Sequence, residues 1–206
     1  MVLAGIFAVV LCLGLILGDW LYFIRLTPDA SRYGCGIARS RDQFTPDRLA
    51  RLLERFDSNG ALILPHGIAR YYSNFDQIAI RPQYRLFSMS FRTAWPLKGL
   101  IHLSADGACY RLLCVKRVPW SSAILTLTWF LLVGLGTIAF LIAYAGQGGF
   151  SSLRGMLMGA GILGIGFLVL AFGVVTVVFS YRLENTRLET VYAELRAAAE
   201  AVHATT

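Results

Sequence analysis

The chain has 206 residues, of which 56% are hydrophobic and 15% are charged, and its formal net charge is +7. Typical soluble domains carry about 25% charged residues, so this composition argues against an ordinary soluble globular protein. A chain of this length has room for a few membrane spans and one small domain outside the membrane.

The first apolar segment covers residues 1–24, and residues 2–18 carry no charged side chain. Trp20 and Tyr22 follow, as aromatic residues often do at a membrane interface. A cleaved signal peptide is the alternative, but no Lys or Arg precedes the apolar run and no small-residue cleavage motif follows it. The sequence therefore predicts an uncleaved transmembrane helix over residues 1–24.

Residues 25–118 are expected to form a basic cytosolic domain. Residues 25–120 hold fifteen of the nineteen Lys and Arg but only seven of the twelve acidic residues, a net charge of +8. Residues 26–44 show no clear period and are interpreted as an irregular linker.

A helix is predicted directly after this linker. Thr45 is a suitable N-cap, Pro46 suits the first helical position, and Gly60 is a natural left-handed residue after the end. One apolar stripe recurs at helical spacing and consists of Leu49, Leu52, Leu53 and Phe56.

Short strands are predicted after the helix. Residues 100–104 and 108–116, with a turn at 105–107, form the clearest hairpin. The other predicted strands are 61–64, 77–80 and 86–92. A helix followed by antiparallel strands predicts an α+β domain in which one helix covers one face of the sheet. About 60 residues bury only a small core, so we expect the domain to lean on the membrane or on a partner.

Two long uncharged segments follow the domain. Thirty-six residues without charge separate Arg117 from Arg154, and twenty-seven more separate Arg154 from Arg182. A membrane-spanning helix needs about 20 apolar residues. The sequence therefore predicts transmembrane helices at 119–145 and 154–181, joined by a short external turn at 146–153.

Residues 182–206 are rich in Ala, Leu, Glu and Arg and are predicted to continue the last span as an amphipathic cytosolic helix. Tyr181, Leu188, Leu195 and Val202 recur every seven residues. We expect this apolar side to dock either onto the domain or onto another subunit.

Lys and Arg flank the spans on one side only, while the turn at 146–153 carries none. The positive-inside rule then predicts an external N-terminus, with the domain and the C-terminus in the cytosol, in a membrane such as the bacterial inner membrane. Cys35, Cys109 and Cys114 show no disulfide or metal-ligand spacing, which fits reduced cytosolic thiols.

Small residues mark candidate helix-packing faces within the spans. Residues 159–164 match a dinucleotide-binding glycine pattern, but they lie inside an apolar span and not after a strand, so the match is spurious. Close helix packing explains the glycines better, either within the hairpin or against a foreign helix. The candidates are Gly14, Gly18, Gly155, Gly159, Gly166 and Gly173.

Asp19 is the one acidic residue within the predicted spans. An intramembrane acid suggests a functional group such as a proton relay or a counter-ion. Because Asp19 lies beside Trp20 and Tyr22, interfacial placement is the alternative.

Several cations near the span ends are candidates for contacts with anionic lipid headgroups. They are Arg25, Arg111, Lys116, Arg117 and Arg182. Aromatic and basic residues interleave in the domain, but no RNA-recognition or helix-turn-helix pattern occurs, and no nucleic-acid partner is expected. No cofactor, metal site or catalytic residue is expected, because the known sequence motifs for them are missing.

These observations favour a non-catalytic accessory or assembly subunit of a larger membrane complex, docking through its glycine-lined spans and its C-terminal helix. A membrane-proximal sensor of lipid or a small ligand is the alternative. A third possibility is an enzyme acting on a membrane substrate, which a conserved polar cluster around His66, Arg70 and Tyr71 would favour.

Overall fold

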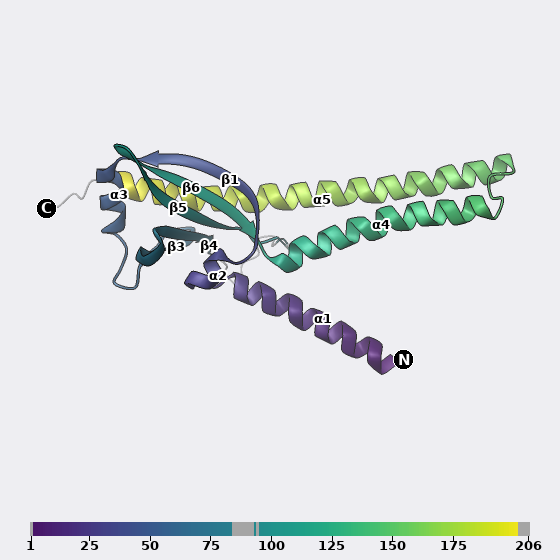
Figure 1. Cartoon of the computed structure of the whole chain (residues 1–206), viewed down its shortest axis with the longest axis horizontal. Coiled ribbons are helices and arrows are strands. Elements are labelled where there is room, and N and C mark those ends of the chain that lie inside the picture. The colour runs from purple at the N-terminus through teal and green to yellow at the C-terminus, as the bar shows by residue number, and fades with distance from the viewer. Residues whose placement is uncertain (1, 84–92, 94, 202–206) are drawn as a thin grey trace. The chain divides into compact units, whose positions relative to one another are not determined.

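The structure is a computed structural model that describes residues 2–83, 93 and 95–201 (Figure 1). The helices are α1 (Val2–Phe23), α2 (Pro28–Arg32), α3 (Pro46–Leu53), the 3-10 turn η1 (Ser73–Phe75), α4 (Trp120–Gly146) and α5 (Leu153–Glu200). The strands are β1 (Cys35–Phe44), β2 (Ala61–Ile63), β3 (Gly67–Tyr72), β4 (Gln77–Pro82), β5 (Lys98–Asp106) and β6 (Cys109–Val118).

The chain divides into two compact units. One contains Met1–Ser121 together with Leu183–Thr206, and the other contains Ser122–Arg182. The first unit is built around a six-stranded antiparallel sheet with the strand order β1-β6-β5-β4-β3-β2. The prediction of helices combined with an antiparallel sheet is therefore confirmed.

The clearest predicted hairpin is present as β5 and β6. Asp106 lies opposite Cys109, and Gly107 between them has a φ of +62°, which favours glycine. The predicted strand at 77–80 is present within β4, and 61–64 corresponds to β2. The predicted strand at 86–92 lies outside the described residues.

The prediction of an irregular linker over residues 26–44 is wrong. This segment holds α2 and the ten-residue strand β1, which pairs along its length with β6. β1 is an edge strand with mostly exposed polar side chains, so it lacks the apolar alternation that marks a half-buried strand. β3 is a further strand that the sequence pattern of residues 67–72 does not predict.

The predicted helix after the linker is α3, and it is shorter than expected. It begins after Thr45, whose side chain makes no cap hydrogen bond, and ends at Leu53. Gly60 has a positive φ of 68°, but it belongs to the turn before β2 and does not end the helix. In that turn, Gly60 donates its backbone N–H to the Asp57 carbonyl oxygen at 2.8 Å.

The sheet has two differently covered faces. One, which we call the α5 face, carries Ile78, Ile101, Leu112, Cys114 and Lys116; the other, the α1 face, carries Tyr72, Ala79, Lys98, Leu100 and His102. α1 and α2 contact Lys98 of the α1 face, and α5 contacts Lys116 of the other face, so the expectation that one helix covers one face is wrong.

The C-terminal part of α5 packs on the α5 face of its own chain. Leu188, Val191, Leu195 and Ala199 are fully buried. A Cβ added to Gly67 in β3 would lie only 2.5 Å from Val191 Cγ2, so glycine lets the helix approach the sheet closely. Of the two docking alternatives, the structure places this side of the helix on the domain. Val202, the last residue of the heptad, lies outside the described residues.

The second unit contains most of α4 and the apolar part of α5. Both helices are long and apolar enough to cross a membrane, judged by length and composition, while the shorter stretch Val9–Phe23 of α1 is also apolar. In this unit, a Cβ added to Gly166 would lie 2.7 Å from Thr137 Cγ2, and one added to Gly173 would lie 2.3 Å from Trp129 Cζ3. These glycines therefore serve the packing of α4 against α5.

Candidate functional site

A buried lysine lies on the α1 face, where α1 ends. Lys98 in β5 is 1% exposed. Its ammonium donates to the carbonyl oxygen of Phe23 at 3.2 Å and to that of Ala30, and it lies 4.0 Å from the centre of the Phe23 ring. No carboxylate among the described residues forms an ion pair with it. The charge is thus held by backbone dipoles and an aromatic ring.

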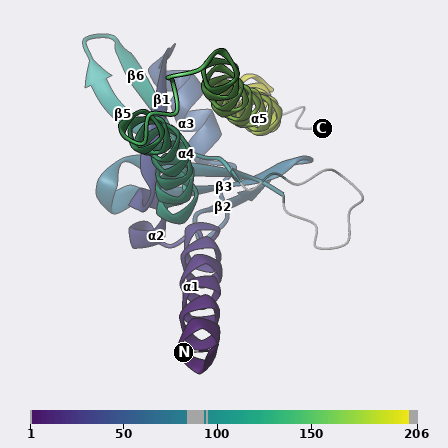
Figure 2. The same cartoon turned by 90° about the vertical axis from the view of Figure 1, so that its right-hand side faces the viewer.

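Three cations from adjacent strands hold the end of α1. Besides Lys98, Arg81 in β4 donates to the carbonyl oxygen of Ile24, and Arg70 in β3 donates to that of Leu26 at 3.0 Å. The last carbonyl groups of a helix have no partner within the helix and carry its negative dipole end. Cations at this end therefore fasten α1 to the sheet. Figure 2 shows α2 beside the end of α1. Because Ala30 of α2 accepts from the Lys98 ammonium, α2 also helps to bury this lysine.

Burial lowers the pKa of Lys98 to about 7, and the positive charges of Arg117 and Arg81 lower it further, whereas Asp19 opposes the shift. A group of this kind changes its charge near neutral pH. At lower pH the sheet therefore holds a buried positive charge against the end of α1.

Asp19 joins α1 to the start of α4. Its carboxylate accepts hydrogen bonds from the Tyr33 hydroxyl and from the backbone N–H of Ser121 at 2.9 Å. Ser121 is in the first turn of α4, where an acidic group satisfies unpaired N–H groups and complements the helix dipole. The hydrogen bond to Asp19 raises the pKa of Tyr33 to about 12. This geometry favours a structural role for Asp19.

Lys116 does not have the lipid-facing position that was expected for it. It lies on the α5 face and is 8% exposed. Its ammonium donates to Asn185 Oδ1 and, at 3.0 Å, to Glu189 Oε1 of α5. Lys116 therefore joins β6 to α5 and is not free to bind a lipid headgroup.

The other predicted headgroup cations have separate surroundings. Arg25 and Arg182 are exposed, and Arg111 pairs with Asp106 at the tip of the β5–β6 hairpin. Arg117 is half-buried on the α1 face, where its Nη1 donates to the carbonyl oxygen of Gly34 at 2.9 Å. The first unit therefore does not bring its own four candidates, Arg25, Arg111, Lys116 and Arg117, together in one site.

The predicted helix-packing glycines fall into two groups. Added Cβ atoms at Gly155 and Gly159 would collide with Gly149 and Phe150 in the hairpin turn. Together with Gly166 and Gly173, these glycines are used within their own unit. By contrast, apart from the adjoining backbone of α1 itself, nothing in the described part of the first unit lies within 4 Å of a Cβ added to Gly14 or to Gly18.

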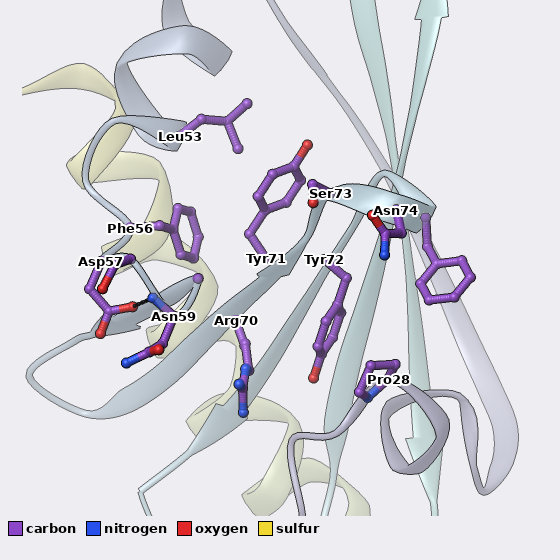
Figure 3. A pocket seen from close by; sticks show the side chains of 13 residues that line it. Pro28, Leu53, Phe56, Asp57, Asn59, Arg70, Tyr71, Tyr72, Ser73 and Asn74 are labelled. Atoms are coloured by element: carbon purple, nitrogen blue, oxygen red, sulfur yellow. Dashed lines mark hydrogen bonds between the residues drawn. The ribbon is translucent and has the colours of Figure 1, made fainter.

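Figure 3 shows a pocket of about 480 Å³ beside the end of α3. The rings of Tyr71 and Tyr72 point to opposite sides of β3, and the Phe56 and Tyr71 ring centres lie 6.0 Å apart. The two charged groups that line this pocket are already engaged: Asp57 accepts from the backbone N–H groups of Asn59 and Ala61, and Arg70 donates to the carbonyl oxygen of Leu26.

The cluster of His66, Arg70 and Tyr71 considered for an enzyme is not one site. Arg70 and Tyr71 line the pocket of Figure 3, but His66 lies at the opposite end of β3. There, His66 Nδ1 contacts the carboxylate of Glu194 in α5, whose Oε2 also accepts the backbone N–H of His66 at 3.1 Å. This histidine fastens the C-terminal helix to the domain.

A second buried charge, Glu184, was also missed. It is 2% exposed and accepts hydrogen bonds from Arg187 Nη1 at 2.8 Å and from the Thr93 hydroxyl at 3.2 Å. Burial raises the pKa of this carboxyl despite the neighbouring Arg187. The signal that could have indicated it is its helical spacing from Leu188 and Val191, which share its face.

A similar signal existed for Lys98, which interrupts the apolar run from Leu97 to Ile101. Among the residues described, no group of three or more His, Cys, Asp and Glu side chains is placed to hold a metal ion. Comparison with known proteins finds no family model, no curated protein and no solved structure that matches this chain.

Proposed function

We propose that the chain is a three-span integral membrane protein that serves as a non-catalytic accessory subunit of a larger membrane complex. In this proposal α1, α4 and the first part of α5 cross the membrane. The N-terminus and the turn between α4 and α5 lie outside, and the sheet domain lies in the cytosol, as the positive-inside rule favours.

The observation that carries the proposal is the contrast between the two ends of α1. Its C-terminal end is fastened to the sheet through Lys98, Arg81 and Arg70. Its preceding turns carry apolar side chains that are more than half exposed, such as Leu11 and Leu15. A helix held at one end and not covered along its length by the rest of its own unit suits docking against another helix.

The glycines support α1 as the docking helix. Small residues let helix backbones approach closely, and Gly14 and Gly18 form such a notch four residues apart. The predicted packing glycines of α5 meet atoms of their own hairpin, and the C-terminal helix covers its own sheet; these glycines are Gly155, Gly159, Gly166 and Gly173. Of the predicted packing glycines, Gly14 and Gly18 of α1 are therefore the two that we assign to contact with a partner.

Mild-detergent purification followed by native mass spectrometry tests the proposal. A partner subunit should co-purify with the wild-type chain and be lost from a Gly14→Leu, Gly18→Leu double variant. Gly164→Leu is the matched control, because no described atom of its unit lies within 4 Å of its added Cβ. A clean monomer in several mild detergents would refute the accessory role.

Membrane placement needs a separate test. Single cysteines replacing Gln147 in the turn after α4 and Ser58 in the exposed turn after α3 would be labelled with a membrane-impermeant maleimide in whole cells, on a background without native cysteines. We expect labelling at position 147 and, at position 58, only after permeabilisation. The reverse pattern would invert the topology.

A further inference from the structure

A groove lies on the α1 face of the sheet, over β1, β6 and β5 and beyond the part that α2 and the end of α1 cover. Its volume of about 670 Å³ is within the range typical of small-ligand sites. Leu113 and Val115 of β6 form an apolar floor, and Arg39, His102 and Arg117 contribute polar groups. Each of these side chains comes from the same face of the sheet.

The backbone of β1 makes room for the groove. The pairing of β1 with β6 shifts by one residue between Gly36 and Ala38, which is a β-bulge. Bulges bend a strand locally and are common beside functional sites. Gly36 also helps, since an added Cβ would lie 3.3 Å from Val115 Cγ1 and crowd the floor.

The groove is positively charged, and the described residues that line it include no neutralising group. None of the residues that line it carries a carboxylate. Among the described residues, no ion pair includes Arg39 or Arg117. Asp42, the acid nearest along β1, lies on the α5 face, where its carboxylate accepts the Tyr192 hydroxyl at 3.0 Å. An anion would therefore meet unopposed cations.

A chain of hydrogen bonds orients His102 in this groove. Arg32 Nε donates to Gln77 Oε1 at 3.2 Å, so the amide nitrogen of Gln77 remains to donate to His102 Nδ1 at 3.1 Å. The ring hydrogen is then on Nε2, which is a further donor. Burial lowers the pKa of His102, and the charges of Arg117 and Arg32 lower it further, as expected beside several cations.

The groove lies next to the point where the chain enters an apolar helix. Arg117 is three residues before Trp120, the first residue of α4, and this tryptophan is exposed. Guanidinium groups bind phosphate through paired hydrogen bonds, and an apolar floor suits the glycerol and first acyl carbons beside a headgroup. We propose that this groove binds the headgroup of an anionic phospholipid. The inference rests on the membrane placement proposed above but not on the accessory role.

Titration of the full-length protein in neutral detergent tests the proposal. Dioctanoyl phosphatidylglycerol is the probe, dioctanoyl phosphatidylcholine is the zwitterionic comparison, and tryptophan fluorescence reports binding. We expect phosphatidylglycerol to bind at least about ten-fold more tightly, a difference of about 1.4 kcal/mol. Glycerol 3-phosphate, which has the phosphate but no acyl chains, should bind much more weakly.

Variants separate the groove from general surface attraction. Arg39→Gln should weaken phosphatidylglycerol binding about five-fold, equivalent to about 1 kcal/mol for one cation near a headgroup. Val115→Glu, which places a carboxylate in the floor, should abolish the preference for the anionic lipid. Arg25→Gln, at an exposed cation beside α1, is the matched control and should change little. Thermal unfolding of each variant verifies that it is folded.

Three results would overturn the inference. Equal affinity for the two lipids would show that the groove does not select charge. Equal weakening by Arg39→Gln and Arg25→Gln would indicate diffuse electrostatic attraction. Tight binding of glycerol 3-phosphate would assign the groove to a soluble phosphate. A reversed labelling pattern at positions 147 and 58 would instead contradict the proposed membrane placement. That result is separate from the lipid-binding results, so the two proposals can fail independently.

Discussion

Replacing Lys98 by Met should remove a specific pH dependence from the stability of the domain. Lys98 is fully buried, and burial lowers the pKa of this lysine from 10.5 to about 7. Between pH 7 and pH 10.5, the unfolded state therefore still holds a proton on Lys98 that the folded state has already released. Stability contributed by this group is lowest below pH 7 and rises as the pH increases through that window.

The magnitude follows from the two pKa values. Between pH 7 and pH 9, linkage adds about 2 kcal/mol to the free energy of unfolding of the wild-type protein through this one group. In Lys98→Met, which fills the site without a titratable group, this increment should be missing. The difference in unfolding free energy between wild type and variant should therefore rise by about 2 kcal/mol over these two pH units.

Urea unfolding of the full-length protein in neutral detergent, followed by tryptophan fluorescence at pH 7, 8 and 9, measures this difference. Arg41→Met is a suitable control, because it removes an exposed cation from the same face of the sheet. Its difference from wild type should not change with pH. Parallel pH profiles for wild type and Lys98→Met would refute the burial of Lys98 as a neutral amine.

Three further outcomes follow from packing. Gly166→Leu should lower the melting temperature of the α4–α5 hairpin, because a Cβ at this position would lie 2.7 Å from Thr137 Cγ2. Gly164→Leu is the control and should leave the melting temperature unchanged. Equal melting temperatures for the two variants would contradict this hairpin packing. Leu195→Ala should destabilise the domain by about 2–5 kcal/mol and speed trypsin cleavage in the C-terminal helix, and an unchanged digestion rate would argue against its docking. Burial raises the pKa of the Cys114 thiol, so a maleimide should modify Cys114 only in urea, as mass spectrometry would detect; rapid labelling of the native protein would disprove its burial.

Local patterns in the sequence were sufficient where a segment's own residues decide its structure. The β5–β6 hairpin is marked by two apolar runs around Gly107, which adopts the left-handed conformation that glycine favours. The long uncharged segments similarly predicted the apolar helices α4 and α5. The continuation of α5 past residue 182 was also predicted correctly, since helix-forming residues run on without a break.

Local patterns failed where a partner elsewhere in the chain decides. β1 is polar along most of its length, so nothing in its own pattern indicates a strand; it is ordered by its pairing with β6, more than sixty residues away. The surroundings of the Lys116 and Arg117 side chains also cannot be predicted from local sequence. The two are adjacent in sequence and equally basic, but alternation in β6 turns Lys116 toward Glu189 and Arg117 toward the groove.

The sequence by itself determined the apolar helices, the strand hairpin and the surplus of positive charge, because periodicity, turn residues and composition are local properties. Only the tertiary structure decided where that charge acts. It placed Lys98 with Arg81 and Arg70 against the end of α1. It also placed Arg39 and Arg117 beside an apolar floor, where neither forms an ion pair with a described residue. The physical reason is that the consequence of a charge depends on its burial and its neighbours, and both are set by strand pairing between segments far apart in the chain.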